Sequence, residues 1–220
     1  MIEPHPLQPF LPHDARLLML GSFPPQQKRW SMEFYYPNWG NDMWRIVGLI
    51  FFGDKHHFEL PGRKAFNKEL LVEFLTRQGI ALYDTASAVR RLRDNASDKY
   101  LEVVTPTDIP ALLARLPRCQ AIVTTGEKAT QTLCQQAEAT QQQAGATQQE
   151  AGATQQAGVT PPPVGGSTPV IFGERAITLY RMPSSSRAYP LSIEKKAEAY
   201  RSLFKELFPT ASPETTDFTD

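Results

Sequence analysis

The sequence has little cysteine, no long apolar run and no excess of charge of either sign. Its 220 residues include two cysteines, Cys119 and Cys134, and the formal net charge at pH 7 is +0. Two cysteines this far apart do not form a disulfide framework, so we expect a reduced, intracellular protein. Zero net charge lowers the expectation of a nucleic-acid partner, although a local basic patch could still bind one.

Signals for membranes, secretion and metals are equally scarce. No apolar run reaches the roughly 20 residues of a membrane span, and the start, MIEPHPLQPFLPHD, lacks the basic and apolar regions of a signal peptide. The four histidines, His5, His13, His56 and His57, show no metal-ligand spacing with cysteines or carboxylates. We therefore expect a cytoplasmic protein with no membrane partner, no metal and no cofactor.

What the chain does contain is an alternation of buried strands and helices. Four short apolar runs have the length and composition of buried strands, at residues 15–20, 80–84, 120–125 and 174–182. Helical spacing and capping residues predict helices from Asn41, over 64–78 up to Gly79, over 107–116 with Thr107 as cap, from Gly126 to about 137, and after Ser192. Such alternation argues for a parallel sheet covered by helices on both faces.

One segment departs from this alternation. Residues 139–158 contain ATQQQAG, ATQQEAG and ATQQAG, followed by PPPVGGSTP. A coiled coil needs apolar side chains at two positions of each heptad, and only alanine is available here. We interpret 137–169 as a low-complexity insertion, disordered or weakly helical, with a partner-binding or DNA-contacting arm as the alternative. It interrupts a single predicted domain of residues 1–208, and 209–220 are predicted to form a flexible tail.

A small, polar or turn-forming segment follows each predicted strand. In chain order these segments are GSFPP, DTAS, TGEK and MPSSS. Ligands of open parallel sheets bind beyond the carboxyl ends of the strands, so the four segments should converge on one site. GSFPP is no phosphate-cradling loop, because its prolines lack amide donors and no Gly-Lys-Ser/Thr ending follows.

Several residues of these segments have both a structural and a functional interpretation. Asp84 either caps a helix or turn formed by TASAV or accepts hydrogen bonds from the polar edge of a ligand. Asn41 is a preferred helix cap and can also serve a ligand. Residues 184–186, three serines followed by Arg187, form either a serine-rich turn or a phosphate-binding loop.

The loop after the first strand is crowded with aromatic side chains. They are Phe23, Trp30, Phe34, Tyr35, Tyr36 and Trp39. About half of them can be core residues. The others are too many to bury beneath one loop, so some should form a stacking surface for a flat ligand.

Taken together, these segments resemble a known family. LGSFPP, YYPNWGNDMWRI, IALYDTASAVRR with RDNASD, VTTGEKA and MPSSSRAYPLSIEKKAEAYRSLF resemble, in order, segments of the uracil-DNA glycosylase superfamily. The similarity is greatest to its mismatch-specific and deoxyinosine (hypoxanthine) branch, and it extends from about residue 15 to 208 outside the insertion. It implies an α/β fold, a three-layer α/β/α sandwich with a central four-stranded parallel sheet.

The resemblance also implies an activity. It points to base excision repair, in which the N-glycosidic bond of a flipped-out deaminated base, hypoxanthine or uracil, is hydrolysed in DNA. The implied partner is DNA containing deaminated bases. The implied enzyme is a cytoplasmic monomer, associated with the nucleoid when it acts.

The resemblance assigns roles to individual residues. Asn41 matches the asparagine that orients the hydrolytic water, and backbone amides around Ser22 would stabilise the departing base. The expected base-binding set is Gly21, Phe23, Tyr36 and Asp84. The expected DNA-binding set is Ser184, Ser185, Ser186 and Arg187, within a loop that grips phosphates and enters the minor groove.

The chain also departs from the family pattern. Strict uracil enzymes have Asp-Pro-Tyr-His after the first strand and His-Pro-Ser after the fourth, where this chain has Ser-Phe-Pro-Pro and Met-Pro-Ser. The deoxyinosine branch usually has Gly at the position of Pro25, and His-Pro-Arg at Asn38-Trp39-Gly40. Two alternatives therefore remain, a non-catalytic nucleic-acid-binding relative and an α/β enzyme that acts on a small nucleotide or nucleoside.

Overall fold

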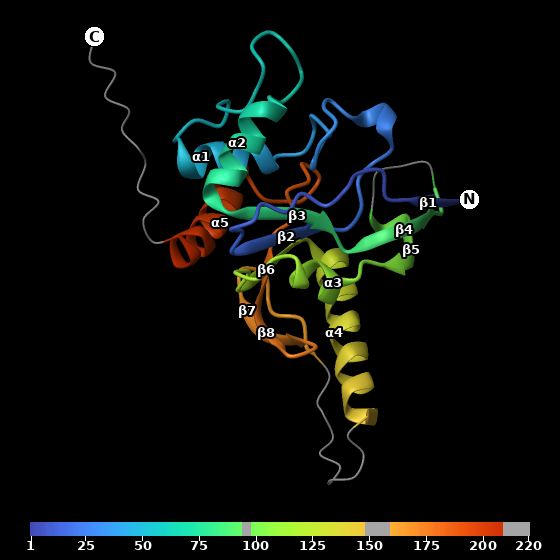
Figure 1. The fold of residues 1–220 in the computed structure, drawn as a ribbon. Helices are drawn as coiled ribbons and strands as arrows, with labels where there is room; N and C mark the ends of the chain where they lie inside the picture. Colours follow the sequence, from blue (N-terminus) through green and yellow to red (C-terminus); the bar gives the residue numbers. More distant parts are fainter. Residues whose placement is uncertain (94–97, 148–158, 209–220) are drawn as a thin grey trace.

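A computed structural model describes residues 1–93, 98–147 and 159–208 of the chain (Figure 1). Its main sheet has the strand order β3-β2-β6-β8-β7. The strands are β2 (Leu17–Gly21), β3 (Ile80–Asp84), β6 (Ala121–Thr125), β7 (Ser167–Phe172) and β8 (Arg175–Met182). Strands β3, β2, β6 and β8 are parallel, as predicted from the four apolar runs.

The fifth strand corrects the predicted four-stranded sheet. Strand β7 pairs antiparallel with β8 through a tight hairpin, and Gly173 adopts a φ of 61° in its turn. Antiparallel neighbours need only a short turn, whereas parallel neighbours need a long crossover. The predicted insertion at 137–169 includes the first residues of STPVIF, so the sequence pattern does not predict this strand.

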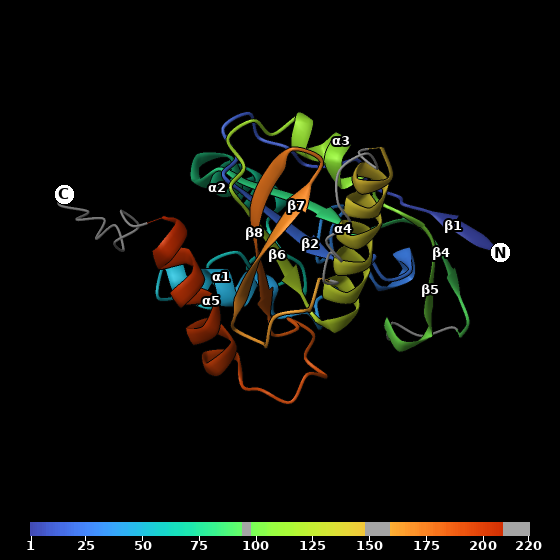
Figure 2. The ribbon, with the colours of Figure 1, turned by 90° about the horizontal axis from the view of Figure 1, so that it is seen from below.

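Helices cover both faces of the main sheet. They are α1 (Met43–Phe51), α2 (Lys68–Gln78), α3 (Ile109–Ala114), α4 (Glu127–Thr147) and α5 (Ile193–Leu207). Figure 1 shows α1, α2 and α5 on one face and α3 and α4 on the other, and in Figure 2 helix α4 lies beside the β7–β8 hairpin. This layering agrees with the predicted α/β/α sandwich.

A second, antiparallel sheet was not predicted. It has the order β1-β4-β5, formed by β1 (Ile2–Pro4), β4 (Ala86–Arg91) and β5 (Leu101–Pro106). The segment TASAV, expected to form a helix or turn capped by Asp84, is therefore the start of a strand. Pairing with two neighbours outweighs the weak strand propensity of its alanines and serine, because strand formation depends strongly on tertiary context.

Some helix ends agree with the predicted ones, and others differ. Gly79 ends α2 at a φ of 69°, and Ser192 caps α5, both as predicted. Helix α2 begins at Lys68 rather than 64, because the Asn67 side chain accepts a hydrogen bond from the Leu70 N–H. The side chain of Asp108, one residue after the predicted cap, likewise accepts a backbone N–H hydrogen bond at the start of α3.

A further difference concerns the predicted insertion at 137–169. Helix α4 continues to Thr147, about ten residues beyond its expected end, and β7 begins inside the assigned range. The remainder of the repeat segment, 148–158, and the predicted tail, 209–220, lie outside the described residues.

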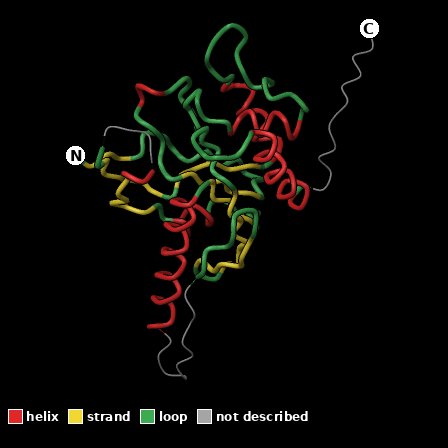
Figure 3. The backbone as a smooth tube through the Cα atoms, turned by 180° about the vertical axis from the view of Figure 1, so that it is seen from behind, coloured by secondary structure: helices red, strands yellow, loops and turns green. Residues whose placement is uncertain are grey.

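The loops before and after α1 lie on the opposite side of the main sheet from α4 (Figure 3). Within the described residues, no helix is both long enough and apolar enough to span a membrane. Cys119 and Cys134 are both free and buried, as expected without a disulfide framework.

Candidate functional site

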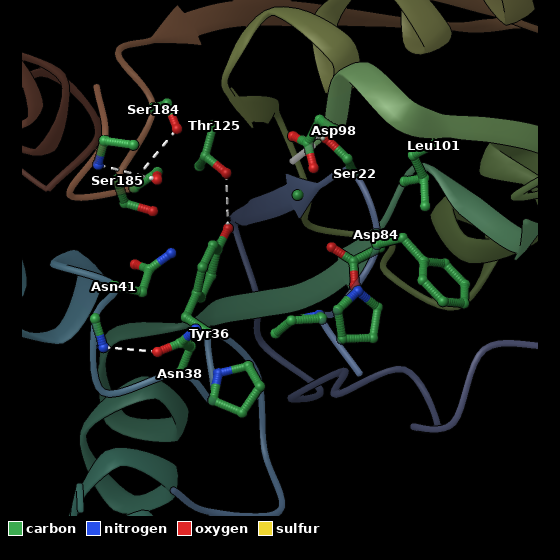
Figure 4. A pocket seen from close by; sticks show the side chains of 18 of the residues that line it. Ser22, Tyr36, Asn38, Asn41, Asp84, Asp98, Leu101, Thr125, Ser184 and Ser185 are labelled. Carbon is green, nitrogen blue, oxygen red and sulfur yellow. Dashed lines mark hydrogen bonds between the residues drawn. The ribbon is translucent and has the colours of Figure 1, made fainter. Parts of the chain in front are cut away.

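A cavity of about 670 Å³ lies beyond the carboxyl ends of the parallel strands. Residues from all four polar segments line it, so the structure brings these segments together as expected from the topology. Every residue of the predicted site lines this cavity except Arg187. Figure 4 shows the side chains in place.

Asp84 ends β3 and is held by a histidine that the sequence did not single out. Oδ2 of Asp84 lies 2.8 Å from Nε2 of His5, and the side chains are 10% and 2% exposed. His5 follows β1, which the second sheet brings next to Asp84. A Cβ atom at Gly21 would collide with Oδ1 of Asp84, so the approach of this carboxylate requires glycine at that position.

A second carboxylate, Asp98, stands on the other side of Gly21 and Ser22. The Ser22 hydroxyl donates to Oδ2 of Asp98 at 2.9 Å. Burial raises the pKa of Asp98; the Ser22 hydrogen bond opposes this rise and the charge of Asp84 adds to it. The sequence showed Asp98 only as part of the RDNASD segment, and no pattern there indicated a role.

Asn41 lies just before α1 and lines the cavity. Asp42, not Asn41, occupies the N-cap position, but Oδ1 of Asn41 accepts a hydrogen bond from the Met43 N–H at 2.9 Å. The capping expectation is therefore off by one residue, while the side chain still satisfies one of the free N–H groups of the helix. This bond fixes the amide plane, and Figure 4 shows its nitrogen turned toward Tyr36.

Residues 184–186, called the serine loop below, are held beside Asn41. Asn41 and Ser186 form an antiparallel bridge, and the Asp42 N–H donates to the Ser185 carbonyl at 2.9 Å. Nζ of Lys196, a fully buried side chain, lies 3.2 Å from Oδ2 of Asp42 and donates to the Ser186 carbonyl at 2.7 Å. A buried ion pair with a further hydrogen bond therefore holds the loop against the start of α1.

Arg187 belongs to the same network. Its guanidinium contacts Oδ1 of Asp42 at 3.2 Å, and its side chain is 57% exposed. The residue thus stands outside the cavity lining, at the exposed end of the buried Asp42–Lys196 pair. A guanidinium has five N–H donors, so this contact leaves donors available to a ligand.

Tyr36 forms one wall of the cavity. Its backbone has a φ of 49°, the one left-handed non-glycine residue in the described part of the chain. The hydroxyl shares a hydrogen bond of 3.0 Å with Thr125, and Trp44 contacts the ring edge-on. Burial raises the pKa of this hydroxyl, so it stays protonated at neutral pH.

Phe23 lines the cavity next to the second sheet. Its ring contacts that of His5 edge-on, with centroids 5.1 Å apart, and the Arg91 guanidinium lies 5.6 Å from its centroid. Arg91 also donates to the Pro24 carbonyl at 2.7 Å. Phe23 and Tyr36 are thus the members of the aromatic cluster that can serve as apolar walls for a flat ligand, while Tyr35 also lines the cavity but is buried in the core.

The other aromatic residues of the loop have structural partners. Phe34 and Tyr35 belong to the core. Trp30 donates to the Pro25 carbonyl, and Trp39 packs on Phe66. Two of the six aromatic residues are therefore core, fewer than the expected half, while Tyr36 and Trp39 are partly buried and pack against the core.

Basic side chains also stand at the cavity. Arg29, Arg91 and Lys99 are among its lining residues. Their positive charges lie near the Asp84 and Asp98 carboxylates, which line the same cavity, although the whole chain has no net charge. In the described part of the chain, no group of three or more His, Cys, Asp or Glu side chains could hold a metal ion.

Comparisons with known proteins identify the fold. No protein-family model matches the chain, and no curated protein matches it. Among solved structures, it is similar to the solution NMR structure of a "putative Uracil DNA glycosylase" from Methanosarcina acetivorans, with a TM-score of 0.59 and 21% sequence identity. The match covers 94% of this chain and 99% of that chain. The two proteins share a fold over nearly their whole length, which agrees with the fold implied by the sequence resemblance.

Proposed function

We propose that the protein is a DNA glycosylase that hydrolyses the N-glycosidic bond of a flipped-out deaminated base, hypoxanthine or uracil, in DNA. One observation carries the proposal. A single cavity is lined by an amide (Asn41), a carboxylate (Asp84) and an aromatic ring (Tyr36), and a serine loop borders it. Its volume of about 670 Å³ lies within the usual range for a small ligand and accommodates a nucleoside.

The carboxylate accounts for the choice of a deaminated base. Hypoxanthine and uracil carry a ring N–H where adenine and cytosine carry an unprotonated ring nitrogen. An ionised carboxylate only accepts hydrogen bonds, so Asp84 pairs with the deaminated base and repels the lone pair of the unmodified one. His5 holds Asp84 through one oxygen, at 2.8 Å, and the second oxygen lies against Gly21 at the cavity wall.

The reaction needs few catalytic groups. Cleavage of the C1′–N bond passes through an oxocarbenium-like transition state, as in glycoside hydrolysis. Asn41 orients the attacking water through its amide, which the Met43 N–H holds in place. Backbone amides of Ser22 and Phe23 stabilise negative charge on the departing base.

Residues at the rim of the cavity bind the DNA. The hydroxyls and amides of residues 184–186 bind phosphate oxygens, and Arg187 and Arg29 supply positive charge. Asp42 and Lys196 hold the serine loop in place. This supports the role, because a prearranged loop loses little conformational entropy on binding. We further propose that the enzyme acts as a monomer, in the cytoplasm and at the nucleoid.

The test is a cleavage assay. The purified protein is incubated with labelled single- and double-stranded DNA that carries one deoxyinosine or one deoxyuridine, and alkali then breaks abasic sites. We expect breaks at the modified position and none in unmodified DNA. Tight binding of abasic DNA without breaks would favour a non-catalytic relative, and hydrolysis of free nucleosides alone would favour a nucleoside enzyme.

A further inference from the structure

A buried guanidinium lies behind the segment that carries Asn41. Arg45 belongs to the first turn of α1, and its side chain is 8% exposed. One of its nitrogens, Nη1, donates to the Trp39 carbonyl at 2.9 Å and to the Asn41 carbonyl at 3.2 Å. These two carbonyls flank Gly40, which lines the cavity together with Asn41. A single side chain therefore holds the backbone on both sides of a cavity residue.

Further contacts fix the guanidinium itself. Its Nε donates to Oε1 of Glu59 at 2.6 Å, in an ion pair whose side chains are 8% and 16% exposed. Its central carbon lies 4.2 Å from the centroid of the Trp39 ring and 5.2 Å from that of the Phe66 ring. A guanidinium that stacks on aromatic rings and donates in its own plane has a defined position and orientation, which a lysine ammonium does not reproduce.

The segment held by Arg45 is a turn at residues 38–41. The Asn38 side chain accepts a hydrogen bond from the Gly40 N–H at 2.7 Å, and the Asn38 carbonyl accepts one from the Asn41 N–H at 2.8 Å. The Asn41 side chain is bonded in turn to the Met43 N–H. The direction of the Asn41 amide therefore follows the position of the turn, and Arg45 is the side chain that ties the turn to the interior of the protein.

We propose that Arg45 is a positioning residue, which sets the place of the Asn41 amide relative to the hydrolytic water and to C1′ of the flipped nucleotide. This proposal rests on the proposed glycosylase function. Arg45 acts through Asn41 and not on the substrate. Because a displacement of about 1 Å at a catalytic group can reduce a rate about 100-fold, the rate of excision should depend on Arg45 far more than the affinity for DNA does.

A control is needed because the loss of any buried hydrogen-bond network destabilises a protein. Arg175 provides it, since its guanidinium also donates to backbone carbonyls, those of Leu113, Leu116 and Cys119. These residues belong to α3 and the segment after it, and α3 lies on the opposite face of the main sheet from α1 (Figure 1). Arg175→Lys therefore measures the effect of losing a similar set of bonds away from the cavity.

The experiment is a double-mutant cycle on the single-turnover rate of excision from DNA with one deoxyinosine or one deoxyuridine. Circular dichroism confirms that each variant is folded at the assay temperature. We expect Arg45→Lys to slow excision about 100-fold, while the Kd for the same DNA changes less than about threefold. In the Asn41→Ala background, Arg45→Lys should slow excision less than about threefold further, because residues that act as a unit are not additive. Arg175→Lys should leave the rate within about twofold of its parent in both backgrounds.

Glu59→Ala provides a second, milder perturbation of the same network. It removes the carboxylate that holds Nε of Arg45 but leaves the guanidinium and both of its carbonyl partners in the chain. We expect it to slow excision about tenfold, and again to have little further effect in the Asn41→Ala background. If Arg45→Lys does not fold, the cycle of Glu59→Ala with Asn41→Ala decides the matter.

Contrary results are distinguishable. An equal loss of rate from Arg45→Lys in the wild-type and Asn41→Ala backgrounds would overturn the proposal. So would a loss confined to DNA affinity, or a loss of rate in Arg175→Lys as large as that in Arg45→Lys. A wild-type protein that excises neither base would instead overturn the proposed function itself, and the role of Arg45 would fall with it.

Discussion

Nε2 of His5 lies 2.8 Å from Oδ2 of Asp84, so the segment after β1 holds a carboxylate that lines the cavity at the end of β3. The two residues are 79 positions apart in the sequence. Because both side chains are buried, each is the main compensation for the other's lost hydration.

Removal of His5 should therefore destabilise the fold as well as the site. We expect His5→Ala to lower the free energy of unfolding by about 3 kcal/mol, because it leaves a buried carboxylate without its partner. The matched control is His13→Ala, since His13 and Asp14 form a pair that is 89% and 63% exposed. Exposed pairs contribute about 0–1 kcal/mol. Urea unfolding followed by circular dichroism checks both, and equal losses in the two variants would contradict the account.

Lys196 offers a second test of a buried pair. Lys196→Met should lower the free energy of unfolding by about 3 kcal/mol, because Asp42 loses its buried cation and the Ser186 carbonyl loses a donor. Lys195→Met, at the exposed neighbouring position, should change it by less than about 0.5 kcal/mol. Thermal or urea unfolding measures the difference. A neutral Lys196→Met would mean that the network does not hold the serine loop.

Arg187 tests the binding of DNA phosphates. Arg187→Ala should weaken binding to duplexes of any sequence and reduce the slope of log affinity against log salt concentration by about 1. Its side chain is half-exposed and pairs with Asp42 at the surface, so stability should change little. Fluorescence anisotropy over a salt series provides the measurement, with the exposed Arg201→Ala on α5 as control. An unaltered salt slope would remove Arg187 from the interface.

The titration of Asp98 should be visible in stability. Its pKa in the fold is raised above the ordinary value of 3.8, so the folded state holds the proton more tightly than the unfolded state. Stability from this group is complete below pH 3.8 and is lost as pH rises through the folded pKa. Relative to the wild type, Asp98→Asn should gain stability over that interval, as unfolding at a series of pH values will measure. A constant difference between the two proteins would show that the pKa is not raised.

The sequence predicted the parallel strands because each is a short apolar run ended by a polar turn. Strands β4 and β7 escaped prediction for different reasons. ASAVRR has little strand propensity and forms a strand only by pairing with β1 and β5, while β7 lies directly after a low-complexity segment. Both strands form because they pair with neighbours in the tertiary structure, and the local sequence pattern does not contain that information.

The site likewise contains residues that the sequence predicts and residues that it does not. Residues at strand ends, such as Ser22 and Asp84, could be predicted because the topology of a parallel sheet places them at one edge. His5 and Lys196 could not, because their partners are 79 and 154 positions away in the sequence and no spacing rule connects them. Long-range ion pairs become visible only when the fold is known.

The most direct test of the proposed activity is the single-turnover rate of base excision in Asn41→Ala, compared with Asn67→Ala. Both variants remove an asparagine oxygen that accepts a backbone N–H at the start of a helix, from Met43 in α1 and from Leu70 in α2. Each should therefore lose about 1 kcal/mol of stability. Only Asn41→Ala should lose activity, by about 100-fold or more on deoxyinosine or deoxyuridine DNA, because only Asn41 faces the cavity. Equal rates in the two variants would contradict the assignment of Asn41 to the hydrolytic water.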